Sequence, residues 1–293
     1  MMVHTMNRPL VIGHRGARGL WPENTLAGFA QAIALGVDAM ELDVAVTADR
    51  EIVVAHDPRL NPDIARGPDG VWLEPPTPTI RALTFEQLCA YDVGRLRPGS
   101  AHAACFPEQR PQDGAKIPRL RDIVSLQPAL PLFIEMKTFP AEPELTVSPA
   151  EMAELTIAVV EAAGAIPRVT MLSFDWRGLR YLRRHHPAVA TGWLTQQKMS
   201  EAERRSWWGE GGCLGSSLSA LQAVVDEGAP CWLPEFPELP PDDVGAAHRL
   251  GVRVIPWAVN RPQDMTDAVE WAVDGFITDR PDLAVNRVAF GKP

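Results

Sequence analysis

The stretch LVIGHRGARGLWPENTLAGFAQAIALGVDAMELDV, residues 10–44, contains one complete strand–helix–strand unit. Residues 10–14 form a short apolar run that predicts a buried strand, and residues 39–44 predict a second strand. Between them, residues 25–36 have the pattern of a helix that ends at a glycine. Two strands joined by a crossover helix lie parallel in one sheet. This unit therefore predicts an α/β fold built on a parallel sheet.

Further apolar runs repeat this pattern to the end of the chain. They predict strands at residues 132–136, 169–173, 190–194, 230–233, 252–257 and 275–278. Helical patterns separate most of these runs, although residues 196–221 are assigned poorly. Eight strands that alternate with helices favour a closed (β/α)8 TIM barrel over an open doubly wound sheet. Barrels of this type reach 293 residues as one domain, so residues 1–293 are expected to form a single domain.

One segment near the second strand departs from this alternation. Residues 51–55 form another apolar run, and the turn before it is too short for a helix. We therefore expect an antiparallel hairpin. A turn centred on Ala48-Asp49 would place Glu41 opposite His56.

Residues 58–117 form a second departure. They are rich in proline, glycine and arginine and contain one clear helical pattern, at residues 84–89. A connection of this length in a compact domain is typical of a functional insertion or a lid. We expect an insertion at about residues 58–117, directly after the hairpin.

The bulk composition limits the classes of partner. The 28 basic and 37 acidic residues give a net charge of -9, which argues against non-specific binding to nucleic acids or anionic membranes. The four cysteines have no CxxC spacing, so neither a zinc motif nor a disulfide framework is expected. No apolar run has the length of a membrane span or a signal peptide. These features predict a soluble cytoplasmic protein, and they leave the oligomeric state open.

Reactive side chains fall at the predicted carboxyl ends of the strands, where TIM barrels hold their active sites. His14 and Arg15 follow the first strand. Glu41 and Asp43 lie two residues apart on the second strand, which puts them on one face about 7 Å apart. Glu135 lies near the end of a later strand. Three carboxylates without a cysteine favour Mg²⁺ or Ca²⁺ over zinc.

Each of these residues also has a purely structural interpretation. A Glu-x-Asp pair is more often a solvated face, but a buried strand should not carry two carboxylates without cause. The glycines at 13 and 16 either permit close approach of a ligand or serve a tight turn. Lys137 could be an ordinary exposed lysine, and Trp257 either a core residue or a wall of the substrate pocket. The histidines interpreted as surface or structural residues are His4, His102, His185, His186 and His248.

The order and spacing of these motifs resemble those of glycerophosphodiester phosphodiesterases over nearly the whole chain. The matching segments are Gly-His-Arg-Gly at 13–16, Pro-Glu-Asn-Thr at 22–25, Glu-Leu-Asp-Val at 41–44, His-Asp at 56–57, Ile-Glu-Met-Lys at 134–137, Trp-Ala-Val-Asn at 257–260 and Asp-Gly-Phe-Ile-Thr-Asp-Arg-Pro at 274–281. Two departures, Asp49-Arg50 for the usual Asp-Gly turn and Ala258 for the usual Thr, remove no catalytic group. The family also has a (β/α) barrel with an insertion after the His-Asp motif.

The resemblance implies hydrolysis of glycerophosphodiesters to sn-glycerol 3-phosphate and an alcohol, with one divalent cation, Mg²⁺ or Ca²⁺. It implies His14 and His56 as the acid/base pair. The implied metal ligands are Glu41, Asp43 and Glu135. The implied phosphate ligand is Arg15, assisted by Lys137. Glu23 and Asn24 are placed at the pocket rim, where they support the metal or Arg15.

Two alternatives remain open at this point. A phospholipase D-like or phosphatidylinositol-cleaving relative on the same barrel would need an exposed apolar rim for lipid. A non-catalytic barrel that only captures glycerophosphodiesters would have no need of two proton-transfer groups. The leaving alcohol, the identity of the cation and the nucleophile, which is water or the glycerol 2-hydroxyl, are not determined by these motifs.

Overall fold

The computed structural model describes residues 8–196, 199–209 and 220–290. In this part of the chain one sheet contains nine strands, and eight of them run parallel in the spatial order β8-β7-β6-β5-β4-β2-β1-β9. These eight are β1 (Leu10–Gly13), β2 (Ala39–Val46), β4 (Leu132–Met136), β5 (Val169–Ser173), β6 (Ala190–Thr195), β7 (Cys231–Pro234), β8 (Arg253–Val254) and β9 (Gly275–Thr278). Hydrogen bonds of 2.9 Å from Asp274 N to Val254 O and from Ile277 N to Pro256 O join the two ends. The sheet is a nearly closed barrel, so the predicted (β/α)8 class is confirmed.

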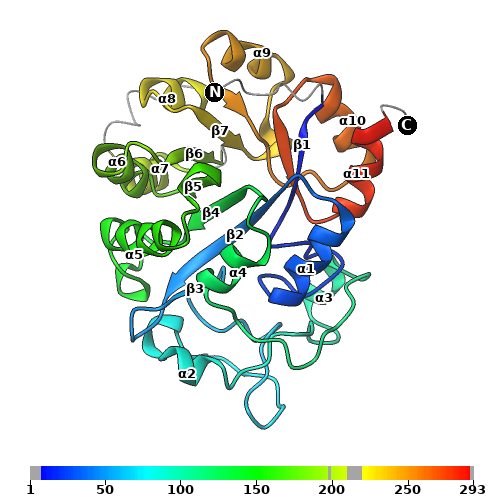
Figure 1. Ribbon diagram of the computed structural model, residues 1–293, viewed down its shortest axis with the longest axis vertical. Coiled ribbons are helices and arrows are strands. Elements are labelled where there is room, and N and C mark those ends of the chain that lie inside the picture. Colours follow the sequence, from blue (N-terminus) through cyan, green and yellow to red (C-terminus); the bar gives the residue numbers. More distant parts are fainter. Residues whose placement is uncertain (1–7, 197–198, 210–219, 291–293) are drawn as a thin grey trace.

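Helices surround this barrel (Figure 1). They are α1 (Leu26–Leu35), α4 (Leu120–Leu126), α5 (Pro149–Ala162), α6 (Trp176–His185), α7 (Glu201–Trp208), α8 (Ala220–Asp226), α9 (Pro241–Arg249), α10 (Pro262–Glu270) and α11 (Pro281–Phe290). The helix predicted over residues 25–36 is confirmed, since Thr25 caps the start of α1 and Gly36 ends it with a φ of 85°. None of the described helices is both long and apolar enough to cross a membrane.

The alternation of side chains along the strands separates two apolar layers. On β2, Met40, Leu42 and Val44 point outward into the core between the sheet and the helices. Ala39 points inward and packs with the apolar lining of the barrel, which includes Ile12, Phe133, Leu172, Leu194, Leu233, Ile255 and Ile277. Because side chains alternate along a strand, Glu41 and Asp43 share the inward face with Ala39. The local pattern thus aims both carboxylates into the barrel, toward its carboxyl end.

The hairpin is present, but its register differs from the predicted one. β3 (Ile52–Val54) pairs antiparallel with β2, and Val44 lies opposite Val54. Extension of this register places Leu42, and not Glu41, opposite His56. The predicted pairing was therefore wrong by one residue.

The turn of the hairpin explains this shift. Thr47 N donates to Glu51 O at 3.1 Å, so three residues form the turn, and its centre is Asp49. Arg50, the last of the three, has a φ of 64°, a left-handed conformation that glycine adopts more easily. The turn therefore has one residue more than predicted, and each residue of β3 pairs with a residue of β2 one position later than predicted.

Two other segments differ from expectation. The strand predicted at 252–257 contains only Arg253–Val254 as β8, since Pro256 has no N–H to continue the ladder. The backbone still follows β7, because Trp257 N donates to Pro234 O at 3.0 Å. Within 196–221, α7 and the start of α8 are described, whereas residues 197–198 and 210–219 lie outside the described residues.

The segment between β3 and α4 folds against β3 on one side of the barrel (Figure 1). It contains η1 (Ile80–Ala82), α2 (Phe85–Leu88) and α3 (Ala101–Cys105). The pattern at residues 84–89 correctly indicates α2, whereas α3 has only five residues and buries none of them, so it leaves no periodic apolar pattern in the sequence. The buried apolar side chains of the segment form a separate core with the hairpin: Ala45, Val53, Ala55, Leu60, Ile64, Ala65, Ile80, Leu88, Val93 and Ile117.

Candidate active site

The carboxyl ends of the barrel strands surround a cavity of about 320 Å³. Of the residues singled out in the sequence, those that line it are His14, Arg15, Glu41, His56, Glu135, Lys137 and Trp257. Asp43 is 1% exposed and lies 3.1 Å from Arg15 Nε through its Oδ2. The barrel thus brings together residues from both ends of the chain at one position.

Three buried carboxylates form one cluster in this cavity. One ligand oxygen each from Glu41, Asp43 and Glu135 lies within 4.8 Å of the others. The parallel register of β2 and β4 pairs Asp43 with Glu135 directly, and the spacing along β2 adds Glu41. An all-oxygen donor set of this kind suits a hard divalent cation.

The electrostatics of the cluster also fit a bound cation. Burial, and then the like charges of Asp43 and Glu135, raise the pKa of Glu41 well above its ordinary value. Asp43 Oδ1 is buried and makes no hydrogen bond to the described residues, although Lys137 Nζ lies 3.8 Å away. A divalent cation would remove the repulsion around Glu41 and give this oxygen a partner. The residues present therefore fit a single metal ion.

Two cations counter the negative charge of the cluster. Arg15 NH1 donates to Glu23 Oε1 at 2.9 Å, and Lys137 Nζ donates to Glu135 Oε1 at 2.7 Å. Burial lowers the pKa of both cations, but the facing carboxylates outweigh it and raise both pKa values. Both side chains are therefore charged at neutral pH and face the cavity, where an anionic substrate could contact them.

The loop after β1 holds Arg15 in a strained conformation. Arg15 has a φ of 50°, and its backbone N–H donates to Glu41 Oε2 at 3.1 Å. A side chain at Gly13 would place its Cβ 2.2 Å from Gly16 O, and Gly16 has a φ of 88°. Both glycines thus serve the tight turn itself, which is one of the two interpretations of the sequence.

His14 is held by a carboxylate from the other end of the chain. Its Nδ1 lies 2.6 Å from Asp279 Oδ1, and its Nε2 lies 3.8 Å from Glu41 Oε2. Burial, followed by the charge of Arg18, lowers the pKa of His14 to about 4, although Asp279 acts to raise it. At neutral pH the ring is uncharged, and with Nδ1–H donated to Asp279 its Nε2 can accept a proton.

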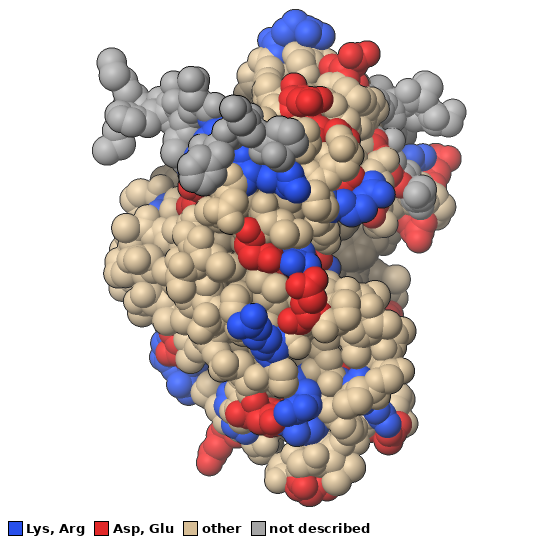
Figure 2. Space-filling view, turned by 90° about the vertical axis from the view of Figure 1, so that its right-hand side faces the viewer, with Lys and Arg blue, Asp and Glu red and all other residues tan. Residues whose placement is uncertain are grey.

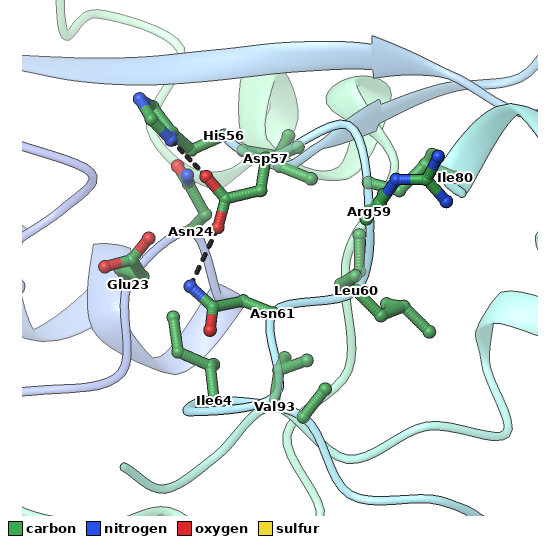
Figure 3. Close-up of a pocket in the computed structure, with 14 residues that line it drawn as sticks. Glu23, Asn24, His56, Asp57, Arg59, Leu60, Asn61, Ile64, Ile80 and Val93 are labelled. Atoms are coloured by element: carbon green, nitrogen blue, oxygen red, sulfur yellow. Dashed lines mark hydrogen bonds and ion pairs between the residues drawn. The ribbon is translucent and has the colours of Figure 1, made fainter. Parts of the chain in front are cut away.

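His56 is held in a similar way by the residue that follows it. Its Nδ1 lies 2.7 Å from Asp57 Oδ1, and Asn61 Nδ2 donates to Asp57 Oδ2 at 2.8 Å (Figure 3). The ring lies near Glu23 and Asn24 in the same view. Its side chain is 32% exposed, whereas that of His14 is 11% exposed. One histidine is therefore buried and the other open to solvent, and both have Nδ1 on a carboxylate.

Arg18, Asn260 and Asp279 were not assigned a role from the sequence, whereas Asn24 was expected at the pocket rim as a support for the metal or Arg15. Asp279 accepts hydrogen bonds from Arg18 Nε at 2.6 Å and Asn260 Nδ2 at 2.7 Å. Asn24 Nδ2 donates to Asp43 Oδ2 at 3.0 Å. Two sequence signals marked Asp279: it comes directly after the last strand, where barrel loops begin, and it lies within the matching segment at 274–281. The contact with His14, 265 residues away, depends on closure of the barrel.

Aromatic and apolar side chains form the opposite wall of the cavity. The rings of Phe174 and Trp257 meet edge to face with centroids 5.4 Å apart. Trp257 Nε1 donates to Leu233 O at 2.9 Å, which fixes the orientation of the indole. Leu172 and Leu194 complete this wall. The cavity is thus charged on the β1–β4 side and largely apolar on the other.

The face of the molecule shown in Figure 2 carries side chains of both charges. Lys and Arg side chains are interspersed there with Asp and Glu. The net charge of -9 repels anions at long range. The cations Arg15, Arg18 and Lys137 at the cavity then supply the local attraction for an anionic group.

Comparison with known proteins gives a consistent family and fold. The sequence model of the glycerophosphoryl diester phosphodiesterase family matches residues 14–283. A glycerophosphodiester phosphodiesterase from Caldanaerobacter subterraneus subsp. tengcongensis is 29% identical over 97% of this chain and 99% of its own length. A crystal structure is known of a candidate glycerophosphoryl diester phosphodiesterase from Silicibacter pomeroyi. Its sequence is 35% identical to this chain, and the two structures superpose with a TM-score of 0.86 over 97% of this chain and 95% of that chain.

A more distant solved structure shares the fold. A phosphodiesterase from Oleispira antarctica, in complex with the product sn-glycerol-3-phosphate, has a TM-score of 0.69 and 19% identity. The match covers 96% of this chain and 97% of that chain.

Proposed function

The chain belongs to the glycerophosphoryl diester phosphodiesterase family, and from this membership we propose that it hydrolyses glycerophosphodiesters to sn-glycerol 3-phosphate and an alcohol with the help of one divalent cation. One observation carries the proposal. Two histidines, each with Nδ1 on a carboxylate, line the same cavity as a buried cluster of three carboxylates. Proton transfer and cation binding are the two capacities that cleavage of a phosphodiester needs.

Glu41, Asp43 and Glu135 would hold the cation. When bound, it would neutralise negative charge on the phosphate and help to activate the nucleophile. Arg15 and Lys137 bind the phosphate oxygens as fixed donors, and Glu23 keeps the guanidinium of Arg15 in place. Mg²⁺ and Ca²⁺ both accept this set of oxygen ligands.

The two histidines divide the proton transfers. His14 is uncharged at neutral pH, so its Nε2 accepts the proton from the nucleophile, which is water or the glycerol 2-hydroxyl. As the bond between phosphorus and the alcohol oxygen breaks, His56 donates a proton to the leaving oxygen. Asp279 and Asp57 hold the two rings so that Nδ1 takes no part in these transfers.

The aromatic wall and the insertion complete the proposed site. Trp257 and Phe174 contact the carbon skeleton of the substrate, because they form the apolar side of the cavity. Residues 58–117 act as an insertion in a single domain of residues 1–293, since their core includes Ala45 and Val53 of the hairpin.

A turnover assay on the wild-type enzyme tests the proposal. We expect release of glycerol 3-phosphate from glycerophosphodiesters with choline, ethanolamine, glycerol or inositol, assayed with Mg²⁺ and with Ca²⁺. Binding of these substrates without product would support the non-catalytic barrel instead. Activity on lysophospholipids or phosphatidylinositol alone would favour the lipid-cleaving alternatives.

Asp279→Asn should lower kcat by about 10²–10⁴-fold, because an amide nitrogen facing His14 Nδ1 favours the tautomer with its proton on Nε2. The measurement is steady-state kinetics together with the melting temperature, since Asp279 also anchors Arg18. Asp267→Asn is the matched control, because the Asp267 carboxylate lies on the surface, away from the cavity, and accepts a hydrogen bond from Gln263 on α10. Equal kcat values for the two variants would contradict the role of Asp279.

A further inference from the structure

A nine-residue part of the insertion lies across the loop that follows β1. We call residues 102–110 the strap. It begins in α3 and contacts the segment 15–25, which carries Arg15 and Arg18. Both guanidiniums face the cavity. The sequence predicted a functional insertion or a lid at residues 58–117, but it singled out no residue of the strap, and His102 was interpreted as a surface or structural residue.

The first contact of the strap reaches Arg15 through one intermediate carboxylate. His102 Nε2 lies 3.5 Å from Glu23 Oε2, while Glu23 Oε1 accepts the hydrogen bond from Arg15 NH1. Glu23 is 8% exposed, so its orientation is set by these neighbours. Burial acts to raise the pKa of Glu23, but Arg15, and next the contact with His102, hold that pKa below its ordinary range. Arg15 therefore holds one oxygen of a charged Glu23 by a hydrogen bond, and His102 lies within ion-pair distance of the other oxygen, which has no hydrogen-bond partner among the described residues.

The other contacts hold the loop at Arg18. Gln109 Nε2 donates to Arg18 O at 2.7 Å, and Arg110 N donates to Leu20 O at 2.8 Å. The Arg18 guanidinium lies over the Phe106 ring, 4.9 Å from its centroid. The strap thus contacts both the backbone and the side chain of this arginine.

The strap also contacts the loop after β9, the strand that pairs with β1. Arg280 NH1 donates to Glu108 Oε1 at 2.7 Å, and Arg280 follows Asp279, which binds Arg18 and His14. These contacts join the insertion, the loop after β1 and the loop after β9 around Arg15 and Arg18. Sites of this kind depend on side chains whose positions are fixed before the ligand arrives.

We propose that His102 is a positioning residue for phosphate binding, which acts from the insertion through Glu23 on Arg15, while the rest of the strap fixes Arg18. This inference rests on the proposed function, in which Arg15 binds the phosphate, and it adds Arg18, which lines the same cavity, as a second arginine near the phosphate. The insertion would then contribute to phosphate binding itself, in addition to any effect on which substrates are accepted.

Calorimetric titration with sn-glycerol 3-phosphate tests the proposal without need of turnover. His102→Ala should weaken binding by about three- to tenfold, as expected for loss of one polar contact. His102→Gln, which can again present an N–H near the position of Nε2, should restore binding to within about twofold of wild type. In steady-state kinetics His102→Ala should raise KM more than it lowers kcat.

Two further variants separate positioning from general damage to the insertion. Glu74→Gln removes the exposed ion pair with Arg97 elsewhere in the insertion and should leave binding unchanged. Gln109→Ala tests Arg18 independently and should weaken binding even if His102→Ala does not fold. The inference is overturned if His102→Ala binds as wild type does, or if His102→Gln binds as weakly as His102→Ala. A wild-type protein that binds glycerol 3-phosphate but cleaves no glycerophosphodiester would contradict the proposed function alone.

Discussion

Replacement of His14 or His56 by alanine is expected to lower kcat for glycerophosphocholine by about 10²–10⁴-fold each, since each ring carries one proton transfer. The double variant should have a kcat only slightly lower than that of either single variant, because the effects of groups that act in one step are not additive. The protein should stay folded. His56 is partly exposed, and without His14 the Asp279 carboxylate keeps the hydrogen bonds from Arg18 and Asn260.

The histidine result needs a control for general damage. His186→Ala removes a surface histidine whose Nε2 lies 2.9 Å from Glu154 Oε1, and it should keep wild-type turnover. Kinetics and melting temperature are measured for all three variants. Near wild-type turnover in His14→Ala or His56→Ala would remove that residue from the proposed mechanism.

The second large effect is expected from removal of the cation. Chelation with EDTA should abolish turnover, and added Mg²⁺ or Ca²⁺ should restore it, because the proposed reaction needs a divalent cation at the cluster of Glu41, Asp43 and Glu135. Glu41→Gln should reduce turnover and weaken metal binding at the same time. Glu201→Gln, which alters only an exposed pair on α7, is the control. Full activity in chelated protein would exclude a metal from the reaction.

The same cluster predicts a definite pH dependence of metal binding. Burial and the neighbouring carboxylates raise the pKa of Glu41, so without metal it holds a proton to higher pH than an ordinary glutamate. A metal ion must displace that proton. Affinity should therefore rise as pH rises through the raised pKa, with proton release on binding. Titration of Mg²⁺ or Ca²⁺ in two buffers of different ionisation enthalpy measures the release, and a value of zero would contradict the arrangement.

Local sequence patterns predicted the parts of the fold that depend on neighbouring residues. The alternation of apolar and acidic residues along 39–44 predicted that Glu41 and Asp43 share a face, and the structure aims both into the barrel. The glycine that ends α1 was likewise readable in the sequence. These features follow from covalent geometry over a few residues. By contrast, the hairpin register was wrong by one position, because the left-handed φ of Arg50 lengthened the turn.

The sequence by itself determined the barrel class, the inward-facing carboxylates and the chemical types of the reactive side chains. Only the tertiary structure decided which of them meet. The register of β2 against β4 pairs Asp43 with Glu135, and closure of the barrel brings Asp279 to His14. The folded insertion brings His102 to Glu23. Contacts over such separations depend on how whole elements pack, and no periodicity in the chain encodes that packing.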